Sequence, residues 1–187
     1  MRKVKKPAMP RGRVRFLDDD ERRRLLDACL VSESPHLYPT VVLALSTGMR
    51  RGEILGLRWR DVDLKAGFAI LHDTKNGERR RVPITGHALI VFRNHSKVRS
   101  LDSDHVFVDV RRAWLTAVKR AGIEDFRFHD LRHSAASYLA MNGASPGEIA
   151  EVLGHKTLQM VKRYAHLSES HTRSVVESMN REVFGEG

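Results

Sequence analysis

One stretch decides the fold and carries most of the candidate chemistry: residues 129–164, which read HDLRHSAASYLAMNGASPGEIAEVLGHKTLQMVKRY. Along an α-helix, side chains three or four positions apart share one face. The apolar positions at its start have this spacing: Leu131, Ala135, Tyr138 and Leu139. His129, Arg132 and the small Ala136 line a different side. We therefore predict a helix over 129–141 held by a buried stripe, with an imidazole and a guanidinium projecting from another face.

Tyr164, at the end of this stretch, is the best candidate for a nucleophile. The chain has three tyrosines, of which Tyr138 lies on the apolar stripe and Tyr38 precedes a proline at an expected helix start. Basic residues flank the third: Lys162, Arg163 and His166. A phenol has a pKa of about 10 and needs positive surroundings or a base to become a nucleophile. We expect Tyr164 to attack a phosphate.

The composition is that of a soluble protein with a polyanionic partner. Lys and Arg number 33 against 23 Asp and Glu, which gives a net charge of +10 and a pI of about 10.2. This balance favours DNA or RNA over a membrane as the partner. The longest apolar runs, such as residues 41–45, are far too short to cross a bilayer. Cys29 is the single cysteine, so no internal disulfide is possible and we expect a reducing cytoplasm.

The amino-terminal half begins with a basic segment and continues with predicted helices. Residues 1–12 are basic and contain two prolines, which is typical of an arm or an interdomain linker, and we assign residues 13–187 to one domain. Asp18 has the features of an N-cap. A second helix is expected from Pro39 to Thr47, where Gly48 can take the left-handed cap conformation.

Arg50 follows this helix directly, and Glu53 lies one helical turn further on. An arginine placed just after a buried helix is held by rigid neighbours, and the carboxylate of Glu53 is spaced to orient its guanidinium. The alternative is a surface Arg–Glu pair, which contributes little to stability. Taken alone, Arg50 and Glu53 favour the interpretation as a surface ion pair.

The pattern then changes to period two, which predicts strands over 68–71 and 80–84. Asn76-Gly77 between them is a strong hairpin signal. Lys75 is expected at the tip of this hairpin, where it is either an ordinary solubilising lysine or one that reaches into a groove. Residues 106–108 are expected to form a third strand or an extended link.

Helices are expected over most of the remaining chain: 87–98, 111–121, 146–153 and 168–184, with a further helix or turn over 157–165. In the second of these, Trp114, Leu115 and Val118 are predicted to face inward. Ser145 to Glu148 has the form of a capping box. The last helix carries an apolar stripe that we expect to pack on this molecule or on a neighbour: Val175, Met179 and Val183.

These residues suit transfer of a phosphoryl group. Attack on a phosphodiester builds negative charge on two non-bridging oxygens, which guanidinium groups match bidentately. We assign this clamp to Arg50 and Arg132. His129 would accept the phenol proton, Lys75 would protonate the leaving 5′-hydroxyl, and His155 would donate to a phosphate oxygen. The linkage formed keeps the phosphate-ester energy, so no metal or ATP is needed.

His129 and His133 also suggest a zinc site, because two histidines four positions apart share a helix face. A zinc protease helix requires Glu after the first histidine, and Asp130 stands there. Arg132 between them would oppose a cation. We therefore predict no metal and no cofactor.

Five short motifs occur along the chain in a fixed order: Thr47-Gly48-Met49-Arg50-x-Gly52-Glu53, Thr74-Lys75-Asn76, His129-x-Leu131-Arg132-His133, Leu153-Gly154-His155 and Tyr164-Ala165-His166. In this order and spacing they resemble the catalytic domain of tyrosine recombinases of the phage integrase type, from about residue 13 to the end. Two positions differ from common family choices: Gly52 replaces a frequent serine and Val161 a frequent threonine. Neither change removes a group that the chemistry needs.

The resemblance implies an α+β fold, mostly helical with a small antiparallel β-sheet. It implies the catalytic set Arg50, Lys75, His129, Arg132, His155 and Tyr164, supported by Glu53 and His133. It implies cleavage and rejoining of double-stranded DNA through a 3′-phosphotyrosyl intermediate, by a protein that is a monomer when free and a tetramer on DNA. Basic residues beside the motifs are assigned to DNA contacts: Arg79, Arg80, Lys156 and Arg163. An amino-terminal DNA-binding domain, usual in such proteins, is expected to be missing from this chain.

Two other functions fit the same sequence. A DNA-binding or assembly module without chemistry would explain the basic charge. A type IB topoisomerase would use similar chemistry without a partner site.

Overall fold

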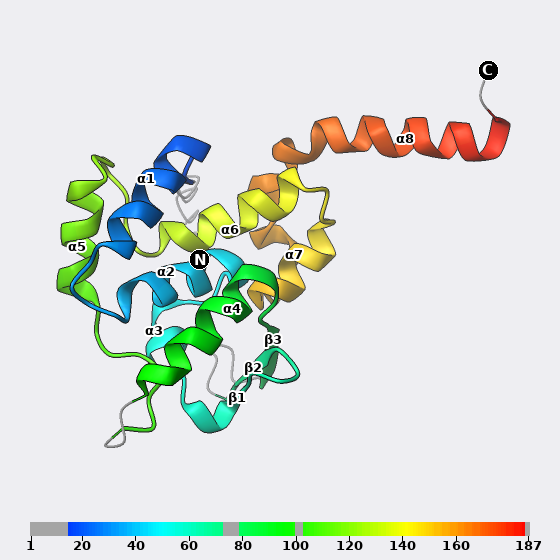
Figure 1. Cartoon of the computed structure of the whole chain (residues 1–187). Coiled ribbons are helices and arrows are strands. Elements are labelled where there is room, and N and C mark those ends of the chain that lie inside the picture. The colour runs from blue at the N-terminus through cyan, green and yellow to red at the C-terminus, as the bar shows by residue number, and fades with distance from the viewer. Residues whose placement is uncertain (1–14, 73–78, 100–102, 186–187) are drawn as a thin grey trace, which may run out of the picture.

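The computed structural model describes residues 15–72, 79–99 and 103–185, with the side chains of 168–174 left aside. Figure 1 shows helices gathered around a central pair, α2 and α6, with a small sheet at one edge. The α-helices are α1 (Asp19–Leu30), α2 (Leu37–Thr47), α3 (Arg51–Leu55), α4 (Gly86–His95), α5 (Arg111–Arg120), α6 (Asp130–Met141), α7 (Pro146–Leu153) and α8 (Glu169–Phe184). The 3-10 helices are η1 (Trp59–Asp61), η2 (Ser96–Val98), η3 (Leu158–Met160) and η4 (Lys162–Ser168). The predicted α+β class, mostly helical with a small antiparallel sheet, is confirmed.

Helix α2 lies at the centre because most of its side chains are apolar. Residues 41–44 are all buried, and the helix packs against α1, α4 and α6, while Ser46 is exposed. It begins two residues before the expected Pro39 and ends where predicted, with Gly48 at φ 62°. Because α2 packs against three other helices, its carboxyl end lies inside the molecule, where Thr47 and Met49 are buried.

Two helices begin with the capping boxes that the sequence indicates. The side chain of Asp18 accepts from the backbone of Glu21, and Ser145 accepts in the same way from Glu148. Each cap contributes about 1 kcal/mol to stability. The cap at Ser145 fixes the start of α7, and the other end of α7 lies at the candidate active site.

The sheet has the order β1-β2-β3 and is antiparallel throughout, with β1 (Val62–Asp63), β2 (Phe68–Leu71) and β3 (Arg80–Pro83). The strands predicted at 68–71 and 80–84 are therefore confirmed, the second ending one residue early. Of the two alternatives for residues 106–108, a third strand or an extended link, the structure shows the link, and His105 beside it forms only an isolated bridge with Arg58. Val106 and Phe107 are both buried, whereas Val108 is exposed.

Along the predicted stripe of α6, Leu131 and Ala135 are buried, whereas Tyr138 and Leu139 are partly buried. In α5, Trp114 is buried and Val118 partly buried, but Leu115 is 63% exposed, so its inward assignment is wrong. Cys29 is buried, and this burial raises the pKa of its thiol to about 12. No helix within the described ranges is both long and apolar enough to span a membrane.

The amino-terminal end of the described chain is tied to α6. The backbone N–H of Leu17 donates to the hydroxyl of Ser134 at 3.1 Å, and the hydroxyl of Tyr138 donates to the carbonyl of Leu17 at 2.9 Å. At the other end, α8 extends away from the body (Figure 1). The stripe predicted on that helix is exposed: Val175, Met179 and Val183.

We predict that Gly48→Ala destabilises the protein. Left-handed backbone costs a residue with a Cβ roughly 1–2 kcal/mol, and the new Cβ would lie 2.2 Å from Cδ2 of Leu153. The free energy of unfolding in urea should fall by at least this amount. Gly52→Ala is the control, because nothing lies within 4 Å of a Cβ there; we expect it to be neutral or slightly stabilising. Equal urea midpoints for the two variants would contradict the prediction.

Candidate active site

Arg132 is the most deeply buried cation of the predicted site. It is 4% exposed; Nη1 donates to the carbonyl of Gly48 at 2.5 Å and Nη2 to the carbonyl of Leu153 at 2.7 Å. These oxygens lie at the carboxyl ends of α2 and α7, where the helix dipoles are negative. The expectation that Arg132 projects away from the core is wrong, because two helix ends replace water as its hydrogen-bond partners.

Arg50 lies at the N-cap of α3, and Glu53 orients it as the spacing predicts. Nη1 of Arg50 donates to Oε1 of Glu53 at 2.7 Å, and the side chain of Glu53 is only 5% exposed. The alternative of a surface ion pair is therefore wrong. Nη2 of Arg80 also reaches this carboxylate, although the sequence assigned Arg80 to the DNA surface.

Tyr164 lies in η4, is 2% exposed, and forms a hydrogen bond with a histidine. Its hydroxyl is 2.5 Å from Nδ1 of His133. His129, to which the sequence assigned the phenol proton, lies one turn away from His133, with ring centroids 5.4 Å apart. The structure thus places the supporting histidine, rather than the expected one, against the phenol.

His155 follows the glycine that ends α7. Gly154 has φ 64°, and the backbone N–H of His155 donates to the carbonyl of Ala150 at 2.8 Å. Nδ1 of His155 is buried without a hydrogen-bond partner among the described residues. A buried, unpaired ring nitrogen is costly in a folded protein and is therefore suited to a polar ligand.

The charges of these side chains act on one another. Burial, followed by the charge of Arg50, lowers the pKa of Arg132 to about 10. Burial also lowers the pKa of His133 and of His155 to about 4, and nearby arginines add to the effect on His155. Burial raises the pKa of Tyr164, while Arg163 and Arg132 oppose the shift. The phenol is thus protonated and both imidazoles are neutral near pH 7, in surroundings with excess positive charge.

The structure brings most of the predicted residues together. The mutual pKa effects join Arg50, His129, Arg132, His155 and Tyr164 in one electrostatic neighbourhood. Lys75 and the Asn76-Gly77 turn lie outside the described residues. The other expected DNA contacts are exposed: Arg79, Lys156 and Arg163.

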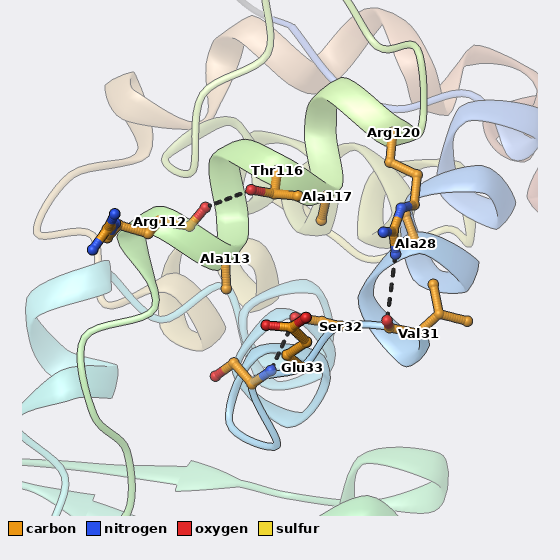
Figure 2. A pocket seen from close by; sticks show the side chains of 10 residues that line it. Ala28, Val31, Ser32, Glu33, Arg112, Ala113, Thr116, Ala117 and Arg120 are labelled. Carbon is orange, nitrogen blue, oxygen red and sulfur yellow. Dashed lines mark hydrogen bonds between the residues drawn. The ribbon is translucent and has the colours of Figure 1, made fainter.

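One hollow of about 310 Å³ borders this cluster, because Glu53 lines it beside Leu57 and Ile70. A cavity of about 370 Å³ lies between the end of α1 and α5 (Figure 2), and none of the predicted site residues line it. Arg120 donates there to the carbonyl of Val31 at 3.3 Å. Among the described residues, no three His, Cys, Asp or Glu side chains group closely enough to hold a metal ion.

The sequence missed two parts of the site. One is the pair of backbone carbonyls that hold Arg132, for which the helix-ending glycines at 48 and 154 are the only signal. The other is the inward position of Arg80, for which the period-two pattern of the strand is the signal, because it places Arg80 on the same face as the buried Val82.

Comparison with known proteins identifies the fold. A model of the Phage integrase family matches residues 15–171. The shufflon-specific DNA recombinase of Escherichia coli is 38% identical over 186 residues, covering 96% of this chain and 47% of that protein. The integrase of Salmonella phage P22 is 36% identical over 188 residues, covering 90% and 48%. The solved catalytic domain of bacteriophage HP1 integrase is 31% identical with a TM-score of 0.75, covering 94% of this chain and 100% of that one.

The fold is that of a tyrosine recombinase catalytic domain. More particularly, the chain belongs to the phage integrase family. It spans about half the length of the two curated relatives.

We predict that stability falls on mild acidification because of the site histidines. The pKa values of His133 and His155 are about 4 in the folded protein against about 6.5 in an unfolded chain. The unfolded state therefore binds more protons between these two pH values. The contribution of the two histidines to stability is fully present above about pH 6.5 and is lost as the pH falls toward 4.

Because carboxylates also titrate in acid, the measurement compares the parent protein with His133→Asn. The urea midpoint of the variant should fall less than that of the parent between about pH 7 and pH 5. Parallel losses in the two proteins would show that this imidazole makes no contribution.

Proposed function

We propose that this chain is the catalytic part of a site-specific DNA recombinase that cuts and rejoins double-stranded DNA through Tyr164. The observation that carries the proposal is the hydrogen bond between Tyr164 and His133 beside the buried guanidinium of Arg132. The relatives support it by their descriptions as a shufflon-specific DNA recombinase and an integrase. We assign the catalytic domain to residues 13–187, within which the family match falls.

In the proposed reaction, the phenol oxygen of Tyr164 attacks the scissile phosphorus. A phosphorus–oxygen bond to tyrosine forms as the bond to the 5′-oxygen breaks, so one phosphodiester replaces another. The phenol proton passes to a neighbouring histidine, and the leaving oxygen takes a proton from Lys75. Because ester is exchanged for ester, the step needs neither ATP nor a metal. Attack by the released 5′-hydroxyl of another strand reverses it and rejoins the DNA.

Arg132 can serve this reaction without leaving its place. A guanidinium has five N–H groups, and the two carbonyls that hold Arg132 take one N–H each from Nη1 and Nη2. The remaining donors, with those of Arg50, are available to the non-bridging oxygens. Both arginines are held before substrate arrives, so their electrostatic stabilisation requires little reorganisation in the transition state.

The arriving phosphate would also change the histidines. A nearby negative charge favours the protonated form of an imidazole. The depressed pKa values of His133 and His155 would therefore rise when DNA binds. His133 would then accept the phenol proton more readily, and His155 would become a better donor to a phosphate oxygen. We assign His129 to the same relay, since its ring stands beside that of His133.

We further propose that the exposed Arg79, Lys156 and Arg163 contact DNA. We also propose that the protein acts in the cytoplasm, as a tetramer when bound to DNA and as a monomer when free. The net charge of +10 supports a polyanionic partner. Plasmid relaxation without sequence preference would instead indicate a topoisomerase, and DNA binding without any covalent product would indicate an assembly module.

We predict that Tyr164→Phe abolishes covalent capture of DNA. The parent protein, incubated with a nicked suicide duplex, should give an adduct that migrates slowly on a denaturing gel. The variant lacks the attacking oxygen and should give none, while its binding measured by filter retention stays close to that of the parent. Tyr38→Phe is the control and should form the adduct. An adduct formed by Tyr164→Phe would assign the nucleophile elsewhere.

We predict that Arg132→Ala slows adduct formation by on the order of 10²-fold, equivalent to about 3 kcal/mol, by analogy with the loss of one oxyanion donor. The change also leaves the carbonyls of Gly48 and Leu153 without their donor, so the melting temperature should fall. Arg132→Lys keeps the charge but cannot bridge both carbonyls and still present a planar pair of donors. Parent-like cleavage by a folded Arg132→Lys would contradict the clamp.

A further inference from the structure

The carboxylate of Glu53 is shared by two arginines from different parts of the chain. Oε1 accepts from the side chain of Arg50, whereas Oε2 accepts from the backbone N–H of Arg50 at 2.8 Å and from Nη2 of Arg80 at 3.2 Å. The terminal torsion of a glutamate side chain has broad preferences. A second guanidinium therefore limits the orientation of the carboxylate that, in turn, orients Arg50.

The other edge of the Arg80 guanidinium lies against the end of α7. Nη1 donates to the carbonyl of Val152, and only 14% of the side chain is exposed. A Cβ at Gly154 would lie 2.9 Å from the same nitrogen. Any larger residue at 154 would displace this guanidinium, so the glycine that leads into His155 also makes room for Arg80.

Arg80 differs in this respect from its neighbours on the chain. Arg79 and Arg81 are exposed, and the guanidinium of Arg81 lies over the ring of Phe68, 3.7 Å from its centroid. The inward direction of Arg80 follows from the alternation of side chains along β3. A bound duplex would meet the outer two arginines first, which argues against a simple surface contact for the middle one.

These contacts connect three segments that each carry part of the site: β3, the start of α3 with Arg50, and the end of α7 that leads to His155. We infer that Arg80 is a positioning residue for strand transfer. It holds Glu53, and through Glu53 it holds Arg50, in fixed relation to His155. This inference rests on the proposed function. Loss of the Arg80 side chain removes none of Arg50, Arg132 and Tyr164 but leaves Arg50 less firmly positioned, so it should affect the rate of the chemical step more than the affinity for DNA.

The test measures the first-order rate of adduct formation at saturating DNA, using a nicked duplex that the parent protein selects from a randomised library. Arg80→Gln should lower this rate by about 10- to 100-fold, the range expected when catalytic groups shift by up to about 1 Å. The dissociation constant for the duplex should change by less than about threefold. Arg81→Gln removes the same charge from the same strand and should change the rate by less than about twofold.

A double-mutant cycle tests whether Arg80 acts through Glu53. If it does, Glu53→Gln combined with Arg80→Gln should be no slower than the slower single variant, because one structural unit is lost only once. Multiplicative effects would overturn the inference. So would a folded Arg80→Gln that cleaves at the parent rate, or one that loses only affinity. Circular dichroism melting checks the fold, and Arg80→Lys, which cannot bridge Glu53 and Val152 together, replaces the glutamine variant if that one unfolds.

The two proposals fail in different ways. If the parent protein forms no adduct with any duplex in the library, the proposed function fails, and this inference fails with it. If the parent forms the adduct and Arg80→Gln forms it equally fast, only the role of Arg80 is overturned.

Discussion

The site depends on how the charge of Arg132 is kept inside the protein. Burying a guanidinium is costly unless its donors are satisfied, and here backbone carbonyls at two helix ends satisfy them instead of a carboxylate. The distinction matters, because a carboxylate would neutralise the charge, whereas carbonyl dipoles leave most of it available. The interior therefore holds a cation that is structurally satisfied and still attractive to an anion. Helices α2 and α7 must end at this point for the arrangement to exist.

The other charged side chains of the site also leave an excess of positive charge. Glu53 forms ion pairs with both Arg50 and Arg80, so these two arginines share one carboxylate. Burial and the excess positive charge lower the pKa of His155. Tyr164 is buried and paired with His133, so the proposed nucleophile is protonated near pH 7. Under the proposed function, the geometry combines a permanent anion site with an attacking group that is restrained until a phosphate changes the electrostatic balance.

Sequence reasoning recovered the elements whose signals are local. The caps at Asp18 and Ser145 and the glycine stops of α2 and α7 were placed correctly because turn and cap chemistry involves only a few neighbouring residues. The failures concern burial. Leu115 fits a helical stripe yet is exposed, and the neighbouring Val106 and Phe107 are both buried although a strand would turn one of them outward. Arg132 and Arg80 are polar residues turned inward, and their partners lie on distant elements that no local pattern reveals.

The hydrogen bonds that join Leu17 to α6 connect positions 117 and 121 residues apart in sequence. Contacts of this kind require a long loop to close before they contribute any stability, which slows folding. The hydrogen bond from Arg132 to the carbonyl of Gly48 is also long-range, because Gly48 lies 84 residues earlier in the sequence. The anion site therefore exists only once these distant segments have come together, and a nascent or partly folded chain would expose the same basic side chains without the arrangement that gives them selectivity.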